Sequence, residues 1–298
     1  MLKKKYHVII VFLISSVCFS QKIKVIDIVS NNSIPYANFS IYKDKKIVQG
    51  SYCNENGEML IKQDLLFDSI VVSCIGYEEQ NFIKEMIVND TLFLKPTVYH
   101  LKEVVIKTNR NNDFETLGFV ETKSKSLIGA FKGMEICTFI ENPSGEVKFI
   151  HSFLFKIRNT NKTKLGFRLH LYEMDTIRRT PTQELLNQDI IVVIENDGKK
   201  QIEHDVSAYS IELPANGAFI GIEWLGELNE ANNNFEDTVF ENGFIELNDK
   251  INSFTTFQRN RFGVFPWSNM ERFKKEAENY QNYKNCPNAS FGIKVYKE

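Results

Sequence analysis

Histidines are the side chains best suited to acid-base or metal chemistry near neutral pH. His100 and Glu103 have the HxxE spacing found in some zinc sites. We place both in a predicted strand, where residues three positions apart point to opposite faces and cannot share a metal ion. His204 precedes Asp205, but no GxSxG elbow supplies the serine of a nucleophilic site. The sequence therefore predicts no catalytic residue, no metal site and no cofactor.

Carboxylates offer a second kind of chemistry. Glu223, beside Trp224, could act with Glu141 or Glu173 on other predicted strands as the paired acids of a glycosidase. Carboxylates are, however, common on the solvated faces of strands. We favour that interpretation, and keep a carbohydrate-active enzyme with its site in the C-terminal β-sandwich as the alternative function.

The segment SFTTFQRNRFGVFPW, residues 253–267, combines aromatic rings with guanidinium groups. Sandwich domains often bind sugars by stacking them on planar rings, so the candidate ligand-binding residues are Phe257, Arg259, Arg261 and Trp267. The same composition is typical of a tightly packed strand and loop in a core or between domains. Packing is the interpretation we favour, and ligand binding is the alternative.

The first twenty residues are predicted to be a signal peptide. Lysines at positions 3–5 precede an apolar run at 8–14, and small residues at 15–20 allow cleavage after Ser20. Cys18 would be the lipidated residue of a lipoprotein, but the residues before it lack the Leu and the Gly or Ala that such processing favours. A periplasmic, secreted or outer-membrane-surface protein is predicted, with lipidation of Cys18 left open.

Charge and hydropathy narrow the expected partners. Loss of the three leader lysines makes the mature chain more acidic than the formal charge of −2 for the full sequence. A nucleic acid partner is therefore not expected. After residue 20 no apolar run approaches the roughly 20 residues that span a bilayer, so no transmembrane segment is predicted in the mature chain. The expected partner is an envelope protein or a glycan.

Four cysteines follow the leader, in a compartment that permits disulfides. The scattered spacing of Cys53, Cys74, Cys137 and Cys286 matches neither a zinc site nor a CxxC pair. Cys53 and Cys74 could pair across neighbouring strands. A chain of this length can bury a full core without disulfides, so we favour single buried thiols.

Short strands separated by turns predict a first domain at residues 21–107, followed by a polar, Asn-rich linker at 108–116. Six or seven strands would form a small antiparallel sandwich, and the continuous apolar run in it would be buried on both faces. The clearest strand patterns lie at residues 22–28, 37–42, 47–52, 58–61 and 68–74.

Four ordered segments of this domain are IPYANFSIY, GSYCNENGEMLI, DSIVVSCIGYEE and DTLFLKPTVYHLKEVVI. Together they resemble the carboxypeptidase regulatory-like domain, a transthyretin-like β-sandwich common at the amino terminus of Gram-negative envelope proteins. The resemblance covers about residues 21–107. The structural-motif residues that carry it are Pro35, Asn56, Gly57, Gly76 and Tyr77.

The resemblance implies an accessory module attached to a larger unit. In true carboxypeptidases that unit is an α/β catalytic domain, but strands and long helices do not alternate after residue 108, so carboxypeptidase activity is not expected. Gly76 is expected to permit a positive φ where a strand ends. Tyr77 would lay its ring over the sandwich edge with its hydroxyl in water, and Cys74 would be an inert apolar residue.

Residues 117–298 predict a second, larger β-sandwich. Strands are expected at residues 148–158, 164–173, 190–195, 203–213 and 217–225. In the second of these, Arg168, His170 and Tyr172 share one face, opposite Phe167 and Leu169. The strand order loosely resembles jelly-roll or galactose-binding-like modules, which supports a fold more than a function.

Two segments of this domain interrupt the β pattern. TPTQELL, residues 180–186, predicts a short helical turn with a hydroxyl cap and proline at its start. Met270, Phe273, Ala277 and Tyr280 recur at helical spacing and predict one short helix near the C-terminus. We favour a helix that covers a sandwich edge over one that binds a partner.

The sequence as a whole predicts an all-β, two-domain, exported protein. We interpret it as a non-enzymatic envelope protein with a binding or structural, accessory role, whose ligand is a carbohydrate or a protein.

Overall fold

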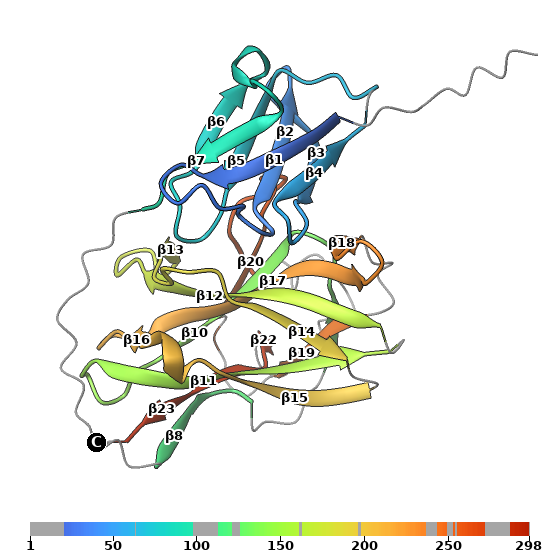
Figure 1. Cartoon of the computed structure of the whole chain (residues 1–298). Helices are drawn as coiled ribbons and strands as arrows, with labels where there is room; N and C mark the ends of the chain where they lie inside the picture. The colour runs from blue at the N-terminus through green and yellow to red at the C-terminus, as the bar shows by residue number, and fades with distance from the viewer. Residues whose placement is uncertain are drawn as a thin grey trace, which may run out of the picture.

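The computed structural model describes residues 21–62, 64–97, 113–120, 126–160, 163–195, 198–236, 243–248, 253, 255–271 and 287–297. Over these residues the chain is all-β, as predicted, with two single-turn 3-10 helices, η1 (Lys84–Met86) and η2 (Ser207–Tyr209). The strands form a small sandwich at residues 21–97 and a large sandwich from residue 113 onward (Figure 1).

The small sandwich packs a three-stranded sheet, β4-β1-β7, against a four-stranded sheet, β3-β2-β5-β6. Its strands are β1 (Gln21–Asp27), β2 (Asn38–Lys43), β3 (Lys46–Tyr52), β4 (Glu58–Ile61), β5 (Ser69–Ser73), β6 (Gln80–Ile83) and β7 (Thr91–Leu94). An antiparallel sandwich was predicted, but β1 and β7 run parallel. They are the first and last strands of the unit, and a connection that long permits parallel pairing.

Alternating burial accounts for these strands. In β1, Ile23 and Val25 are fully buried in the core of the small sandwich, while the residues between them are partly exposed. The run predicted to be buried on both faces alternates as well. Ile70 and Val72 of β5 are fully buried, whereas Val71 is partly exposed. The outer face of its sheet is therefore only partly covered.

The large sandwich has two eight-stranded sheets. One has the order β13-β12-β17-β10-β20-β21, with β14 beside β12 and β18 beside β17. Its strands are β10 (Met134–Ile140), β12 (Lys164–Met174), β13 (Pro181–Glu184), β14 (Ile191–Glu195), β17 (Ala218–Asn229), β18 (Asn234–Glu236), β20 (Thr256–Asn260) and β21 (Ser268–Asn269).

The other sheet has the order β22-β19-β11-β23-β8, with β15 and β16 beside β11 and β9 beside β19. Its strands are β8 (Phe114–Gly118), β9 (Ser126–Gly129), β11 (Lys148–Asn159), β15 (Gly198–Asp205), β16 (Glu212–Leu213), β19 (Gly243–Asn248), β22 (Asn288–Ala289) and β23 (Phe291–Tyr296). The apolar core lies between the two sheets.

Strand β12 is buried on both faces. Phe167 and Leu169 face the core between the two sheets, as predicted. Arg168 and His170 point the other way, yet they are only 1 % and 0 % exposed. The small sandwich covers this second face, above β12, β17 and β20 (Figure 1).

An apolar cluster joins the two sandwiches beside this face. The rings of Tyr52 and Phe262 lie with their centroids 5.2 Å apart, as do those of Tyr36 and Phe235. Phe262 also packs on Gly50, where an added Cβ would come within 2.1 Å of the ring. Burial of four aromatic rings across the junction favours one fixed arrangement of the two units.

Two predictions made from local sequence patterns differ from the structure. The helical turn predicted at residues 180–186 is wrong, because Pro181–Glu184 is strand β13, paired with β12. Pairing with the edge of a long strand outweighs the weak local helix signal. Strand β8 starts at Phe114, inside the range predicted as a linker. The predicted C-terminal helix lies outside the described residues from position 272 to 286.

Candidate functional site at the domain junction

Four charged side chains form one row across four neighbouring strands of the large sandwich. Arg168 of β12 is paired in register with Glu223 of β17, which is opposite Glu135 of β10, which is opposite Arg259 of β20. Both glutamates are 0 % exposed. The row therefore has the sign order plus, minus, minus, plus, so each carboxylate has a guanidinium on its outer side.

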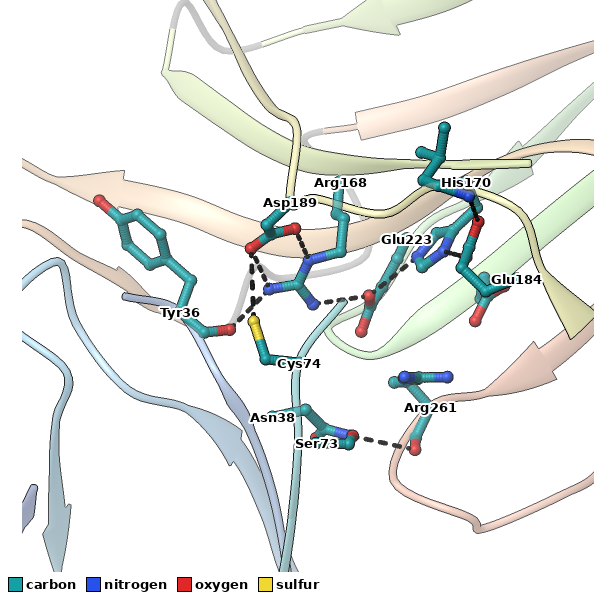
Figure 2. A network of polar contacts seen from close by, with 12 residues as sticks. Tyr36, Asn38, Ser73, Cys74, Arg168, His170, Glu184, Asp189, Glu223 and Arg261 are labelled. Carbon is teal, nitrogen blue, oxygen red and sulfur yellow. Dashed lines mark hydrogen bonds and ion pairs between the residues drawn. The ribbon is translucent and has the colours of Figure 1, made fainter. Parts of the chain in front are cut away.

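Arg168 connects this row to the small sandwich and to a loop (Figure 2). Its Nε and Nη2 donate to the two carboxylate oxygens of Asp189 at 2.5 and 3.1 Å, and its Nη1 donates to Glu223 at 2.8 Å. Nη2 also donates to the backbone carbonyl of Tyr36 at 2.6 Å. Burial alone would lower the pKa of Arg168, but the charges of Asp189 and Glu223 outweigh it and raise the pKa.

Glu223 accepts hydrogen bonds from three directions. Besides Arg168, the Tyr52 hydroxyl of the small sandwich donates to Oε1 at 2.7 Å, and His170 Nε2 lies 3.1 Å from Oε2. Burial would raise the pKa of Glu223, but the Arg168 charge and the His170 hydrogen bond hold it well below its ordinary value. Glu223 is thus a fully buried carboxylate that stays ionised.

His170 lies between two carboxylates. Its Nδ1 is 2.5 Å from Glu184 Oε2 and 2.8 Å from the Tyr172 hydroxyl, while Nε2 faces Glu223. Burial opposes the charged form, but the carboxylates of Glu135 and Glu184 outweigh it and raise the pKa of His170 to about 9. At neutral pH the ring is therefore an imidazolium that donates from both nitrogens.

Arg259 closes the other end of the row. Its Nε donates to Glu135 at 2.8 Å and its Nη2 to the Tyr172 hydroxyl at 3.0 Å. The guanidinium lies 4.4 Å from the centroid of the Trp267 ring and 5.4 Å from that of Tyr172. Arg259 and Trp267 are thus in direct contact with each other.

The four candidate ligand-binding residues do not share one place. Arg259, Arg261 and Trp267 line a groove of about 410 Å³ between the sandwiches, which we call the Arg261 groove. Phe257 is 8 % exposed and packs edge-on against Phe219, with ring centroids 5.5 Å apart. Phe257 does not line this groove but a second pocket, and it belongs to an aromatic cluster against which Trp267 also packs.

Glu223 does not lie on a solvated strand face, as we favoured from sequence, and it does not form the alternative pair with Glu141 or Glu173. Glu223 is buried, whereas Glu141 and Glu173 are exposed at the far ends of β10 and β12. Ile140, next to Glu141, is in register with Ala218, five residues along β17 from Glu223, a distance of roughly 17 Å at 3.4 Å per residue. The carboxylate opposite Glu223 is Glu135, which the sequence analysis did not select.

The histidine-containing pairs considered from sequence are a further point of comparison with the structure. His100 and Glu103 lie outside the described residues. Asp205 Oδ2 is 3.8 Å from His151, and its Oδ1 accepts from the Ser207 backbone. In the described part of the chain, no three His, Cys, Asp or Glu residues are grouped so that they could hold a metal ion.

The thiols are buried and unpaired. Cys53, Cys74 and Cys137 are free cysteines, as favoured from sequence, and Cys286 lies outside the described residues. Burial raises the pKa of Cys53 to about 12 and also raises that of Cys74. Cys74 Sγ lies 4.0 Å from Asp189, beside the charged row.

Three of the structural-motif residues, Pro35, Gly76 and Tyr77, line a second groove of about 430 Å³, together with Asp189 and others. Gly76 has the predicted positive φ, +89°, and an added Cβ would lie 2.8 Å from the backbone oxygen of Asn187. Glycine is therefore required for close approach of the large sandwich as well as for the strand end.

Tyr77 corrects one expectation. Its hydroxyl donates to Asp27 at 3.1 Å instead of lying free in water, and burial, with Asp27, raises the pKa of Tyr77 to about 12. Asn56 and Gly57 form the expected turn. Gly57 has φ +73°, and the Asn56 backbone N–H donates to Asn54 Oδ1 at 3.0 Å.

Comparisons with known proteins give one weak likeness. No family model matches the sequence, and no curated protein is similar to it. Among solved structures, the cysteine protease and lectin-like domains of Cwp84, a surface layer associated protein of Clostridium difficile, align with a TM-score of 0.39 and 10 % identity. The alignment covers 87 % of this chain and 50 % of that chain. Within the described residues, no helix is long and apolar enough to cross a membrane.

Proposed function

We propose that this chain is a non-enzymatic binding protein of the cell envelope, in which the small sandwich is an accessory module fixed to the large one and the ligand is a carbohydrate or a protein. The observation that carries the proposal is the state of Glu223. This carboxylate is fully buried and already bound by Arg168, His170 and Tyr52. A group in that state fixes two domains together and has no free position for a substrate.

The accessory role rests on how the small sandwich is held. Tyr52 and the Tyr36 carbonyl contribute hydrogen bonds to charged groups of the large sandwich, and Gly76 permits contact with residue Asn187. The open spaces nearby are grooves along this junction. The resemblance of residues 21–107 to a carboxypeptidase regulatory-like domain supports the same role, and the leader sequence supports export.

A binding and turnover screen tests this function. Residues 21–298 would be applied to an array of glycans and muropeptides and to envelope proteins, and every ligand bound would then be incubated with the protein and analysed for products. We expect saturable binding with no chemical change in the ligand.

Any product release would contradict the proposal. The sharper result is release that is lost in a folded Glu223→Gln variant and kept in Glu141→Gln, a matched change of an exposed carboxylate. That result would favour a carbohydrate-active enzyme built on the Glu135 and Glu223 pair. Absence of any ligand in the complete screen would also overturn a binding role.

A further inference from the structure

The Arg261 groove lies where the two sandwiches meet and takes its walls from both. The small sandwich contributes polar side chains from β2 and β5, and the large sandwich contributes the end of β20 and the turn after it. The residues used below are Asn38, Ser40, Ser73, Glu79, Arg261 and Trp267.

Arg261 differs from the other cations at the junction. Each of the four carboxylates in the network binds another cation: Glu135 binds Arg259, Asp189 binds Arg168, and Glu184 and Glu223 bind His170. Arg261 Nε is buried without a hydrogen-bond partner. Among the described residues, the Arg261 side chain makes no ion pair, although its backbone is fixed by Gly133 and Asn38 (Figure 2).

Two further polar atoms without partners lie close by. Asn38 is 4 % exposed, and its Oδ1 accepts no hydrogen bond although its Nδ2 donates to Ser73 at 3.2 Å. Glu135 Oε1 also accepts none, but Glu135 is fully buried in the charged row and does not line the groove. Buried polar groups in folded proteins are rarely left unpaired, so such a cluster marks a place where something else completes the hydrogen bonds.

The chemistry of the groove selects the ligand. The Arg261 guanidinium, whose Nε has no hydrogen-bond partner, presents a planar fork of donors that matches a carboxylate. Burial and the Arg259 charge would lower the pKa of Arg261, but Coulombic interactions with Glu223, Tyr172 and Glu135 raise it. Around it lie the hydroxyls of Ser40 and Ser73 and the exposed carboxylate of Glu79, which are groups that hydrogen-bond to sugar hydroxyls. Trp267 supplies an aromatic wall, with Arg259 over its ring.

We infer that the Arg261 groove binds a saccharide that carries a carboxylate, such as a uronic acid, with the carboxylate on Arg261. The inference rests on the proposed binding function and names the ligand class and the residue that selects it. Glu79 at the rim disfavours a second negative charge, so a singly charged sugar unit fits the groove better than a phosphate monoester.

Calorimetric titration of residues 21–298 with oligogalacturonate, oligoglucuronate and the methyl esters of both tests the inference. Each ester keeps the sugar and replaces the carboxylate by an uncharged methyl ester group. We expect the acid to bind at least tenfold more tightly than its ester, and Arg261→Gln to remove most of that difference. Val71→Phe, which narrows the groove and leaves every charge in place, should weaken both forms. Arg178→Gln removes an exposed arginine from another surface and should change nothing.

Thermal unfolding of each variant shows that it is folded before it is titrated. Equal binding of acid and ester, or unchanged binding in Arg261→Gln, would overturn the inference and leave a binding function in place. Equal competition by inorganic sulfate or acetate would show a simple anion site and overturn the saccharide assignment. If neither uronate binds while the array finds another ligand, the inference fails and the proposed function stands.

Discussion

Glu135 and Glu223 lie directly opposite each other on antiparallel strands β10 and β17, and both carboxylates are fully buried. Like charges in that position repel, and the pair is tolerated because Arg259 and Arg168 bind the two glutamates from the outer strands. The Tyr52 hydroxyl then ties Glu223 to the small sandwich. The contact between the two domains is therefore part of the charge balance of the large sandwich.

Neutralising Glu223 should destabilise the chain strongly. The variant Glu223→Gln keeps the shape of the side chain but leaves Arg168 and His170 with one carboxylate less in a buried site. We expect the free energy of unfolding to fall by about 3 kcal/mol. Urea unfolding of residues 21–298 measures it, with the exposed Glu141→Gln as the control that should change by less than about 0.5 kcal/mol. Equal values for the two variants would contradict the charge-row account.

Stability should fall as the pH rises above neutral. The pKa of His170 is raised to about 9 in the folded chain from 6.5, so its stabilising contribution is complete below about pH 6.5 and is lost as the pH rises through about 9. The whole shift corresponds to on the order of 3 kcal/mol at 1.36 kcal/mol per pKa unit. Unfolding free energies measured from pH 6 to 8, below the titration of the thiols, should show more than half of this loss in the wild-type chain and not in His170→Gln. A parallel pH dependence in both proteins would assign the titration to another group.

Substitution of Gly76 should separate the cost of a side chain at positive φ from the cost of its contact with Asn187. In Gly76→Ala, the positive φ is strained and the new Cβ meets the Asn187 oxygen at 2.8 Å. Gly145→Ala is the matched control, because Gly145 has φ +69° and nothing within 4 Å of an added Cβ. We expect Gly145→Ala to lower the unfolding free energy by about 1 kcal/mol and Gly76→Ala by clearly more. If the two variants lose the same unfolding free energy, the contact with Asn187 does not contribute to the cost of the substitution.

The buried thiols should be inert in the native chain. In a Cys286→Ser background, Cys53, Cys74 and Cys137 remain, and all three are buried free cysteines. Burial holds the pKa of each above its ordinary value, so little thiolate forms near pH 8. A disulfide-exchange reagent should react only after urea is added. Rapid labelling of one equivalent in the native protein would identify a reactive cysteine.

The all-β fold was predictable because its signal is local. Alternation in residues 22–28 and 164–173 follows from one face meeting a core, and the structure places β1 and β12 there. The segment at 180–186 was not predictable in this way. Proline and hydroxyl side chains are compatible both with a helix start and with strand β13. Pairing with β12 determines that the segment is a strand.

The site was only partly predictable. The sequence placed Arg168, His170 and Tyr172 on one face, and it selected Arg259, Arg261 and Trp267, but it could not show that a second domain buries that face. A usable signal was nevertheless present. Glu223 interrupts an apolar strand at its centre, and Glu135 interrupts the start of another. A solvated residue is not expected at either position, and such carboxylates are buried only when paired. Asp189 lies in a loop and gave no such signal.

The burial of the charge row has a consequence for the ionic conditions in which the two domains stay together. Salt screens charges that are reached by solvent ions, so exposed pairs such as Lys95 with Glu78 weaken as salt is added. Glu223 and Arg168 are 0 % and 1 % exposed, out of reach of those ions. A salt concentration high enough to weaken the surface ion pairs should therefore leave the two sandwiches in contact, with the Arg261 groove between them unchanged in shape.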